Sequence, residues 1–244
     1  MLGGGLVHVP ALRQCRPMGG RQPEVGDVLR CDTHMSGFFL LATNVLGEPI
    51  YESQMRTIFA LSNATSGLNP TCVEALPSED TWKCNFAEFS YAYSQVRTFV
   101  INSEMDSWQG GCIMTSMTVD PTCDTCNGNC SSAPGWKCAS SDLKTCPSGT
   151  FFEPALIYQQ KFRDRMYTNA GMQRAGNGGY FSSCFTHCEG QFDGAWNTWR
   201  VGGKSMGQAV ADWYTGSSGA PVSQNTYRDC HLFLDGNHQC DSQC

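Results

Sequence analysis

The sequence predicts an α/β protein with a mainly parallel sheet and flanking helices. Segments rich in β-branched and aromatic residues alternate along the chain with segments whose apolar residues recur every three or four positions. Residues 95–101 and 179–185 are the clearest strands, and polar residues of catalytic type follow each of them. A chain of 244 residues is long enough to bury the core of one such domain.

The first part of the chain divides into an arm and the start of the domain. Residues 1–26 are rich in Gly, Pro and Arg and show no period, so they are either foreign to the domain or a surface arm. We place the domain at 27–244. The apolar run 38–42 suits a strand or a buried loop, whereas 55–62 and 86–93 suit helices.

Two later segments carry the strongest helical pattern. In residues 151–166 the apolar side chains recur at steps of four, three, four and four. They are Phe151, Ala155, Tyr158, Phe162 and Met166. Pro154 lies near the start of this helix, where its missing N–H costs nothing. Residues 205–214 form a second amphipathic helix, which aligns Met206, Val210 and Trp213.

Cysteine content indicates the compartment. Fifteen cysteines predict an oxidising environment, with about seven disulfides and one thiol left over. We expect a disulfide-stapled lid at 112–150 and sequon glycosylation at Asn63 and Asn129. The protein should therefore be secreted. Its first ten residues lack the pattern of a signal peptide, so we expect the true N-terminus to lie upstream.

Charge and hydropathy exclude several partners. The net charge of −6 and the pI near 5.3 argue against nucleic acid or an anionic membrane. No run of 18 apolar residues occurs, so we expect no membrane span. We also expect no cofactor and no metal.

Two strand ends carry residues of catalytic type. Asp106 follows the strand at 95–101, and His187 ends the strand at 179–185. In open α/β sheets the site forms beyond the carboxyl ends of strands, and an acid followed by a histidine matches the α/β-hydrolase order. Histidine would take a proton from a serine, and the carboxylate would orient it. Alternatively, Asp106 is a turn residue or helix cap, and His187 a polar side chain beside a disulfide.

Four runs of sequence resemble motifs of one enzyme family. MDSWQ at 105–109 resembles the acid-bearing motif of pectin acetylesterases, and SCFTHC at 183–188 resembles their Ser-Cys-x-x-His-Cys motif. AVADWY at 209–214 is similar to a family helix, and Cys31 with GFF at 37–39 is similar to the run after the nucleophile helix.

The resemblance covers the chain from about Val25 to Cys244 and implies a fold and an activity. The fold would be a partial α/β-hydrolase domain of the pectin acetylesterase and Notum family. The activity would be that of a serine carboxylesterase acting on acetylated polysaccharide or another acyl ester. Asp106 would be the acid, His187 the base, and Trp108 a substrate contact.

The chain departs from the family pattern at the nucleophile. No Gly-x-Ser-Ala-Gly-Gly elbow lies upstream of Arg30, and Met35 stands where the family has an acidic residue. One Gly-x-Ser-x-Gly occurs at 203–207, but it follows His187 and no apolar strand leads into it, so Ser205 is better interpreted as a helix N-cap. We expect an enzyme by family whose serine nucleophile is absent from this chain. The alternative is a non-catalytic, disulfide-stapled extracellular binding domain derived from the esterase.

Two further readings involve the cysteines. Cys123, Cys126 and Cys130, or Cys184, His187 and Cys188, could form zinc sites, but each set lacks a properly spaced second pair. A thiol hydrolase would use Cys184 or Cys188 beside His187. If both cysteines form disulfides, neither has a free thiolate to act as a nucleophile, so we favour the serine esterase.

Overall fold

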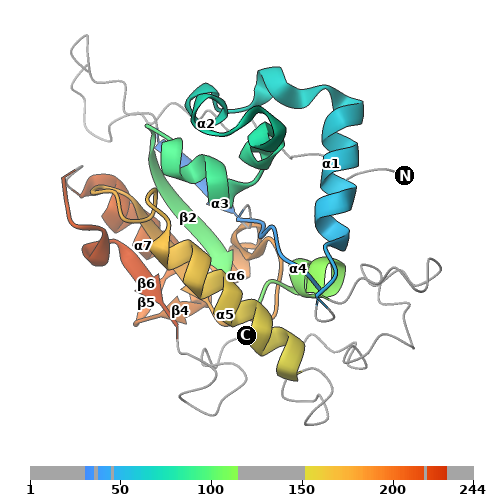
Figure 1. Cartoon of the computed structure of the whole chain (residues 1–244). Helices are drawn as coiled ribbons and strands as arrows, with labels where there is room; N and C mark the ends of the chain where they lie inside the picture. Colours follow the sequence, from blue (N-terminus) through green and yellow to red (C-terminus); the bar gives the residue numbers. More distant parts are fainter. Residues whose placement is uncertain (1–30, 36–37, 45–46, 115–151, 217–218, 230–244) are drawn as a thin grey trace.

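Four parallel strands form the centre of the molecule. The computed structural model describes residues 31–35, 38–44, 47–114, 152–216 and 219–229. The strands lie in the order β1-β2-β3-β6, and every neighbouring pair is parallel. They are β1 (Cys31–Met35), β2 (Arg97–Ser103), β3 (Gly178–Ser182) and β6 (Thr226–Arg228). The predicted α/β class with a mainly parallel sheet and flanking helices is confirmed (Figure 1).

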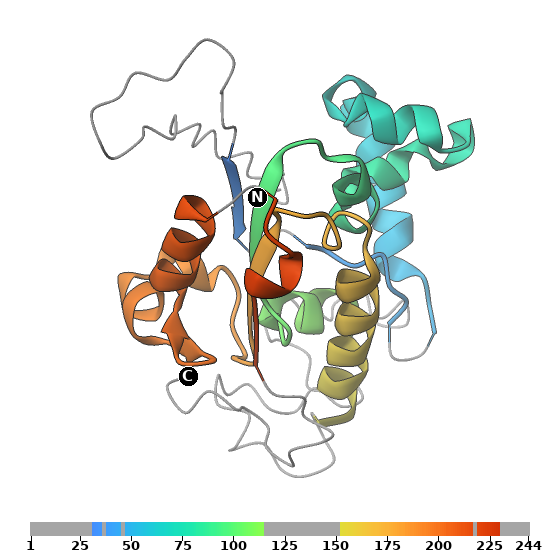
Figure 2. The ribbon, with the colours of Figure 1, turned by 90° about the vertical axis from the view of Figure 1, so that its left-hand side faces the viewer.

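Strand β2 is apolar on both sides, as a parallel strand covered on two faces must be. Successive side chains point to opposite faces. Phe99 and Ile101 belong to one buried cluster, and Val100 between them belongs to the other. Helices therefore cover the sheet on both sides, and Figure 2 shows this arrangement with the sheet nearly edge-on.

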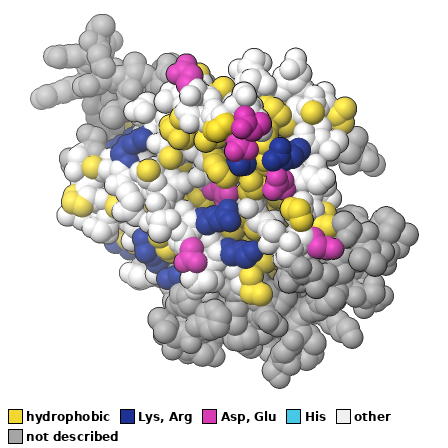
Figure 3. All heavy atoms as spheres, viewed as in Figure 1, with side chains coloured by type: hydrophobic (Ala, Val, Ile, Leu, Met, Phe, Trp, Pro, Cys, Tyr) yellow, Lys and Arg dark blue, Asp and Glu magenta, His cyan; other side chains and the backbone are white. Residues whose placement is uncertain are grey.

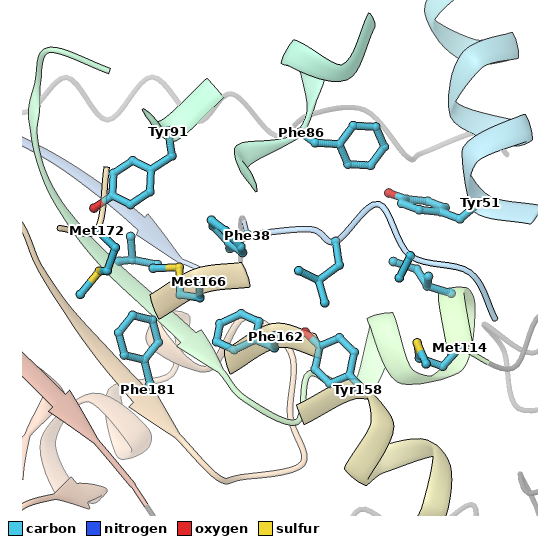
Figure 4. Packing of buried hydrophobic residues seen from close by; sticks show 14 of the residues in the cluster. Phe38, Tyr51, Phe86, Tyr91, Met114, Tyr158, Phe162, Met166, Met172 and Phe181 are labelled. Atoms are coloured by element: carbon cyan, nitrogen blue, oxygen red, sulfur yellow. The ribbon is translucent and has the colours of Figure 1, made fainter. Parts of the chain in front are cut away.

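The larger cluster lies between the sheet and the helices α1 (Ile50–Ser62) and α5 (Phe152–Thr168). Phe162 and Met166 of α5 are fully buried in it, and Phe162 packs edge-on against Phe181 of β3 at 6.0 Å between ring centroids (Figure 4). The apolar side chains that recur in the sequence thus face the sheet along the described part of α5.

The smaller cluster lies on the other face. It joins β2 and β3 to α6 (Asp193–Thr198), to the antiparallel pair β4 (Arg200–Val201) and β5 (Lys204–Ser205), and to α7 (Met206–Thr215).

Helix α7 starts where the sequence predicts but buries a slightly different face. Met206, Ala209 and Trp213 are fully buried, whereas Val210 is only half-buried. The helix begins after Ser205, whose Oγ accepts the Gln208 N–H at 3.2 Å. The predicted N-cap is confirmed.

The helical layer before β2 consists of short pieces that the sequence pattern predicts poorly. Residues 86–93 form two turns, and a disulfide joins Cys72 to Cys84 with their Cα atoms 5.9 Å apart. The remaining elements are α2 (Pro70–Ala75), α3 (Ala87–Ser90), α4 (Ser107–Gln109), the π-turn η4 (Gly110–Met114) and the 3₁₀ turns η1 (Ala64–Gly67), η2 (Ser78–Asn85), η3 (Tyr91–Tyr93), η7 (Glu189–Gln191) and η8 (Val222–Gln224).

Several predictions fall outside the described residues. These are the arm at 1–26, the lid apart from its first three residues, and Asn129. Asn63 is described and is exposed at the end of α1. Within the described ranges, no helix combines the length and apolar character needed to cross a bilayer.

Candidate active site

Strands β2 and β3 end together, and this brings their two following loops to one edge of the sheet. Ser103 and Ser182, the last residues of the two strands, are paired in the ladder. The ladder continues for one more hydrogen bond, from the Glu104 N–H to the Ser182 carbonyl at 2.8 Å. Residues that leave both strands at this edge must therefore lie close together.

The turn after β2, residues 103–106, presents Asp106 to the second loop. The Asp106 carboxylate is fully buried, and its Oδ1 accepts the Gln109 N–H at 2.9 Å as the N-cap of α4. The Ser103 hydroxyl accepts the Met105 N–H at 2.8 Å and donates to the Cys184 carbonyl in the neighbouring loop. Asp106 is thus the helix cap that the sequence left as an alternative, and it also reaches the histidine.

His187 lies against Asp106. Its Nδ1 is 2.9 Å from Asp106 Oδ2 and 3.1 Å from Oδ1, and a backbone bond from the Ser107 N–H to the Thr186 carbonyl at 3.1 Å holds the two loops together. Because an ionised carboxylate only accepts, Nδ1 carries the proton and Nε2 keeps its lone pair. The side chain is 27% exposed, so this edge remains in reach of solvent.

Aromatic rings surround the histidine on one side. Trp108 and Phe39 each have their ring centroid 6.1 Å from that of His187, and they meet one another edge-on at 5.3 Å. Tyr51 of α1 packs behind Trp108 at 6.1 Å. Both Trp108 and Phe39 are half-buried. Trp108 therefore lies where a substrate contact was expected, although its role stays a prediction.

Two buried tyrosines lie near the Asp106 charge. Burial, with a smaller contribution from Asp106, raises the pKa of Tyr51 well above its ordinary value. Burial followed by the charges of Asp106 and Glu104 does the same to the pKa of Tyr158. Both phenols stay protonated around neutral pH, so neither is suited to act as a base there. The His187 imidazole is suited to that role.

Gln109 is a site residue that the sequence reasoning did not assign. Its Oε1 accepts the Leu40 N–H at 3.0 Å and its Nε2 donates to the Phe38 carbonyl at 3.2 Å. It thereby fixes the buried irregular segment that carries Phe39. A signal was available, because Gln109 closes the MDSWQ run and its side chain offers both a donor and an acceptor.

Glu104 was also missed. Its carboxylate is fully buried and accepts hydrogen bonds from Arg163, Tyr167 and Gln159 of α5. Burial raises the pKa of Glu104 to about 7, although its three partners oppose the shift. Its position two residues before Asp106 was the only sequence signal.

The serines near the site are engaged elsewhere. Ser205 belongs to the hairpin and helix on the smaller-cluster face, where it caps α7, whereas Phe39 and Trp108 beside His187 pack against the larger cluster. Ser183 donates its hydroxyl to Asp229 Oδ2 at 2.7 Å.

The structure also bears on the two alternatives that involve cysteines, the thiol hydrolase and the zinc sites. Cys184 is disulfide-bonded, and the Nδ1 of His187 is occupied by Asp106. Across the residues that the structure describes, no group of three or more His, Cys, Asp or Glu side chains is arranged to hold a metal ion. Cys123, Cys126 and Cys130 lie outside those residues.

Comparison with known proteins gives one consistent result. The model of the pectinacetylesterase family matches residues 26–244. Among curated proteins of Arabidopsis thaliana, pectin acetylesterase 11 is 24% identical over 184 residues, covering 73% of this chain and 42% of the relative. Pectin acetylesterase 7 is 24% identical over 210 residues, with coverages of 78% and 49%. Pectin acetylesterase 5 is 24% identical over 215 residues, with coverages of 86% and 44%. The chain thus spans less than half the length of these relatives.

Proposed function

Because the chain belongs to the pectinacetylesterase family, we propose that it carries the acid and the base of a serine carboxylic-ester hydrolase. Asp106 is the acid and His187 the base. The observation that supports this is the 2.9 Å contact between a fully buried carboxylate and a partly exposed imidazole. The two side chains come from different strand-end loops at one edge of a parallel sheet, which is where such sites form.

The proposed chemistry follows from the free ring nitrogen. Nε2 of His187 takes the proton from a serine hydroxyl while that oxygen attacks the acyl carbon. The ester C–O bond then breaks, and the departing alcohol receives the proton from Nε2. Water next attacks the acyl-serine with the same base, releasing the carboxylic acid and restoring the serine. Asp106 keeps the ring in the productive tautomer and stabilises the imidazolium in both halves of the reaction.

We place the nucleophilic serine outside these 244 residues. Ser205 is the only serine in a Gly-x-Ser-x-Gly pattern, and its hydroxyl is used as a helix cap on the face away from the aromatic rings beside His187. Ser103 and Ser183 use their hydroxyls to hold the two site loops. None of these three is arranged as an elbow nucleophile.

The name of the relatives suggests the substrate, and the disulfides suggest the compartment. The relatives are called pectin acetylesterases, so we propose an acetylated polysaccharide, with Trp108 contacting the sugar or the acyl group. Cys72 and Cys84 are joined, and Cys112 and Cys184 are also disulfide-bonded, which supports secretion through an oxidising compartment.

The test compares the 244-residue chain with the product of the complete transcript on a chromogenic acetate ester. We expect turnover from the longer product only. In that product His187→Ala should lower kcat by roughly 10⁶-fold and Asp106→Asn by roughly 10⁴-fold, because the histidine moves the proton whereas the carboxylate only orients the ring. Turnover by the 244-residue chain that disappears on Ser205→Ala would contradict the proposal. A complete product that folds but hydrolyses no ester would favour the extracellular binding domain instead.

A further inference from the structure

A second buried carboxylate lies beside the proposed acid, and the proposed chemistry does not use it. Glu104 is fully buried, with its Oε2 accepting hydrogen bonds from Gln159 at 3.0 Å and from Arg163, and its Oε1 accepting one from Tyr167. All three donors belong to α5. A buried ion pair is weak evidence for stability, because removing two charges from water offsets much of their attraction. Another role for Glu104 is therefore worth seeking.

Glu104 and Asp106 lie on the same short turn, so a movement of Glu104 would also move Asp106. One residue separates them, and the turn between them is fixed by the Glu104 N–H on the Ser182 carbonyl and by the Met105 N–H on the Ser103 hydroxyl. Asp106 itself contacts His187 and the Gln109 N–H. The turn is thus held on one side by β3 and α4, and on the other side by α5 through the Glu104 side chain.

The side chains that face Glu104 come from α5, and one side chain of β6 lies behind them. Arg163, Tyr167 and Gln159 come from α5, and Tyr158 of the same helix is close enough to sense the charges of both Glu104 and Asp106. Arg228 at the end of β6 lies over the Tyr167 ring at 3.5 Å. Helix α5 therefore packs behind both carboxylates, and Figure 4 shows Tyr158 and Phe162 of α5 packed beside β2.

We infer that Glu104 is a positioning residue, which ties the turn at 103–106 to α5 and so sets the place of the Asp106 carboxylate against His187. This inference rests on the proposed function, but the contact between Asp106 and His187 can be measured without any ester turnover. Loss of the Glu104 side chain should let the turn shift and lengthen the contact between Asp106 and His187.

The readout is the proton NMR resonance of the His187 Nδ1–H, recorded on the 244-residue chain labelled with ¹⁵N-histidine. His187→Ala assigns the resonance among the five histidines. We expect Glu104→Ala to abolish it or move it upfield. Glu104→Gln should retain it, because an amide of the same shape still accepts from Arg163 and Gln159 while the Tyr167 hydroxyl turns to accept. Rescue by Gln separates positioning from loss of a charge.

Glu88 provides the matched control. It is a carboxylate on α3 that pairs with Arg165 of the same helix α5, at 2.8 Å, and its side chain is only 4% exposed. Glu88→Ala removes a similar ion pair without touching the turn, so the resonance should stay in place. If Glu104→Ala fails to fold, Tyr167→Phe removes a single hydrogen bond to Glu104 and should give a smaller upfield shift.

Three results would overturn the inference. They are an unchanged resonance in Glu104→Ala, an equal loss in Glu88→Ala, and, if Glu104→Ala does not fold, an unchanged resonance in Tyr167→Phe. In an active complete product, Glu104→Ala should lower kcat by about tenfold or more with little change in KM, since small misplacements of catalytic groups cost about that much. Absence of esterase activity alongside the expected NMR changes would count against the proposed function only.

Discussion

Asp106 and Glu104 are two buried carboxylates with different surroundings. Asp106 accepts from a backbone N–H and a histidine ring, both of which are compatible with a carboxylate anion. Glu104 accepts from three side chains of α5, and burial raises its pKa to about 7 in spite of Arg163. The two carboxylates therefore have different hydrogen-bond partners although only Met105 separates them.

Glu104 should make stability fall as the pH rises from about 4.5 to 7. Its folded pKa is raised, so the folded chain holds this proton more tightly than the unfolded chain, and stability present below pH 4.5 is lost as the pH approaches 7. The shift from 4.5 to about 7 corresponds to about 3 kcal/mol. Glu104→Gln should remove this part of the pH dependence, as measured by urea unfolding at pH 4.5 and pH 8.

Burial also raises the pKa of Glu88, so the wild-type slope contains a contribution of the same sign from that residue. The difference between wild type and Glu104→Gln isolates the contribution of Glu104. Equal slopes for the two proteins would contradict the prediction.

The site residues that could be predicted from the sequence are those that directly follow a predicted strand. Asp106 and His187 follow strands, and parallel strands end at one edge, so their proximity could be predicted. Glu104 and Gln109 depend on where a side chain points across the fold, 55 and 69 positions along the chain from Gln159 and Leu40. Periodicity contains nothing about such contacts.

At the scale of elements, the start of α7 depends on Ser205. Ser205→Ala removes the acceptor of the Gln208 N–H and half of a capping box, and should cost about 1 kcal/mol of unfolding free energy. Ser205→Thr keeps the hydroxyl and should stay near wild type, as measured by thermal unfolding. In an active complete product neither variant should change kcat more than twofold. A loss of kcat in Ser205→Ala without a loss of stability would make Ser205 the nucleophile.

The elements that could be predicted are those with a sustained period. Helices α5 and α7 and strands β2 and β3 appear within a few residues of the predicted bounds, because each buries a regular face. The short turns of 64–93 have too few residues to show a period. Residues 38–42 alternate between buried and half-buried side chains. They form a loop, because side chains of Asn102 and Gln109 rather than a neighbouring strand bond to their backbone.

At the scale of the molecule, the described residues form a sheet between two unequal layers. On the face shown in Figure 3, Lys and Arg side chains are interspersed with Asp and Glu, without a field of one sign. The aromatic residues around His187 pack against the larger layer, which contains α1 and α5. Changes in that layer are therefore the ones expected to reach the site.

Removal of the disulfide between Cys72 and Cys84 tests whether the short helices of that layer affect only the stability of the fold or also the geometry of the site. It closes a loop with a sequence separation of 12, and a bridge over a loop of this length stabilises a fold by about 3 kcal/mol. Replacing both cysteines by serine should lower Tm by roughly 6–12 °C for a domain of this size. The His187 Nδ1–H resonance should not move, because the bridge joins α2 to η2 and neither contacts the turn at 103–106 through a hydrogen bond or ion pair within the described residues. A displaced resonance would show that the layer before β2 also sets the geometry of the site.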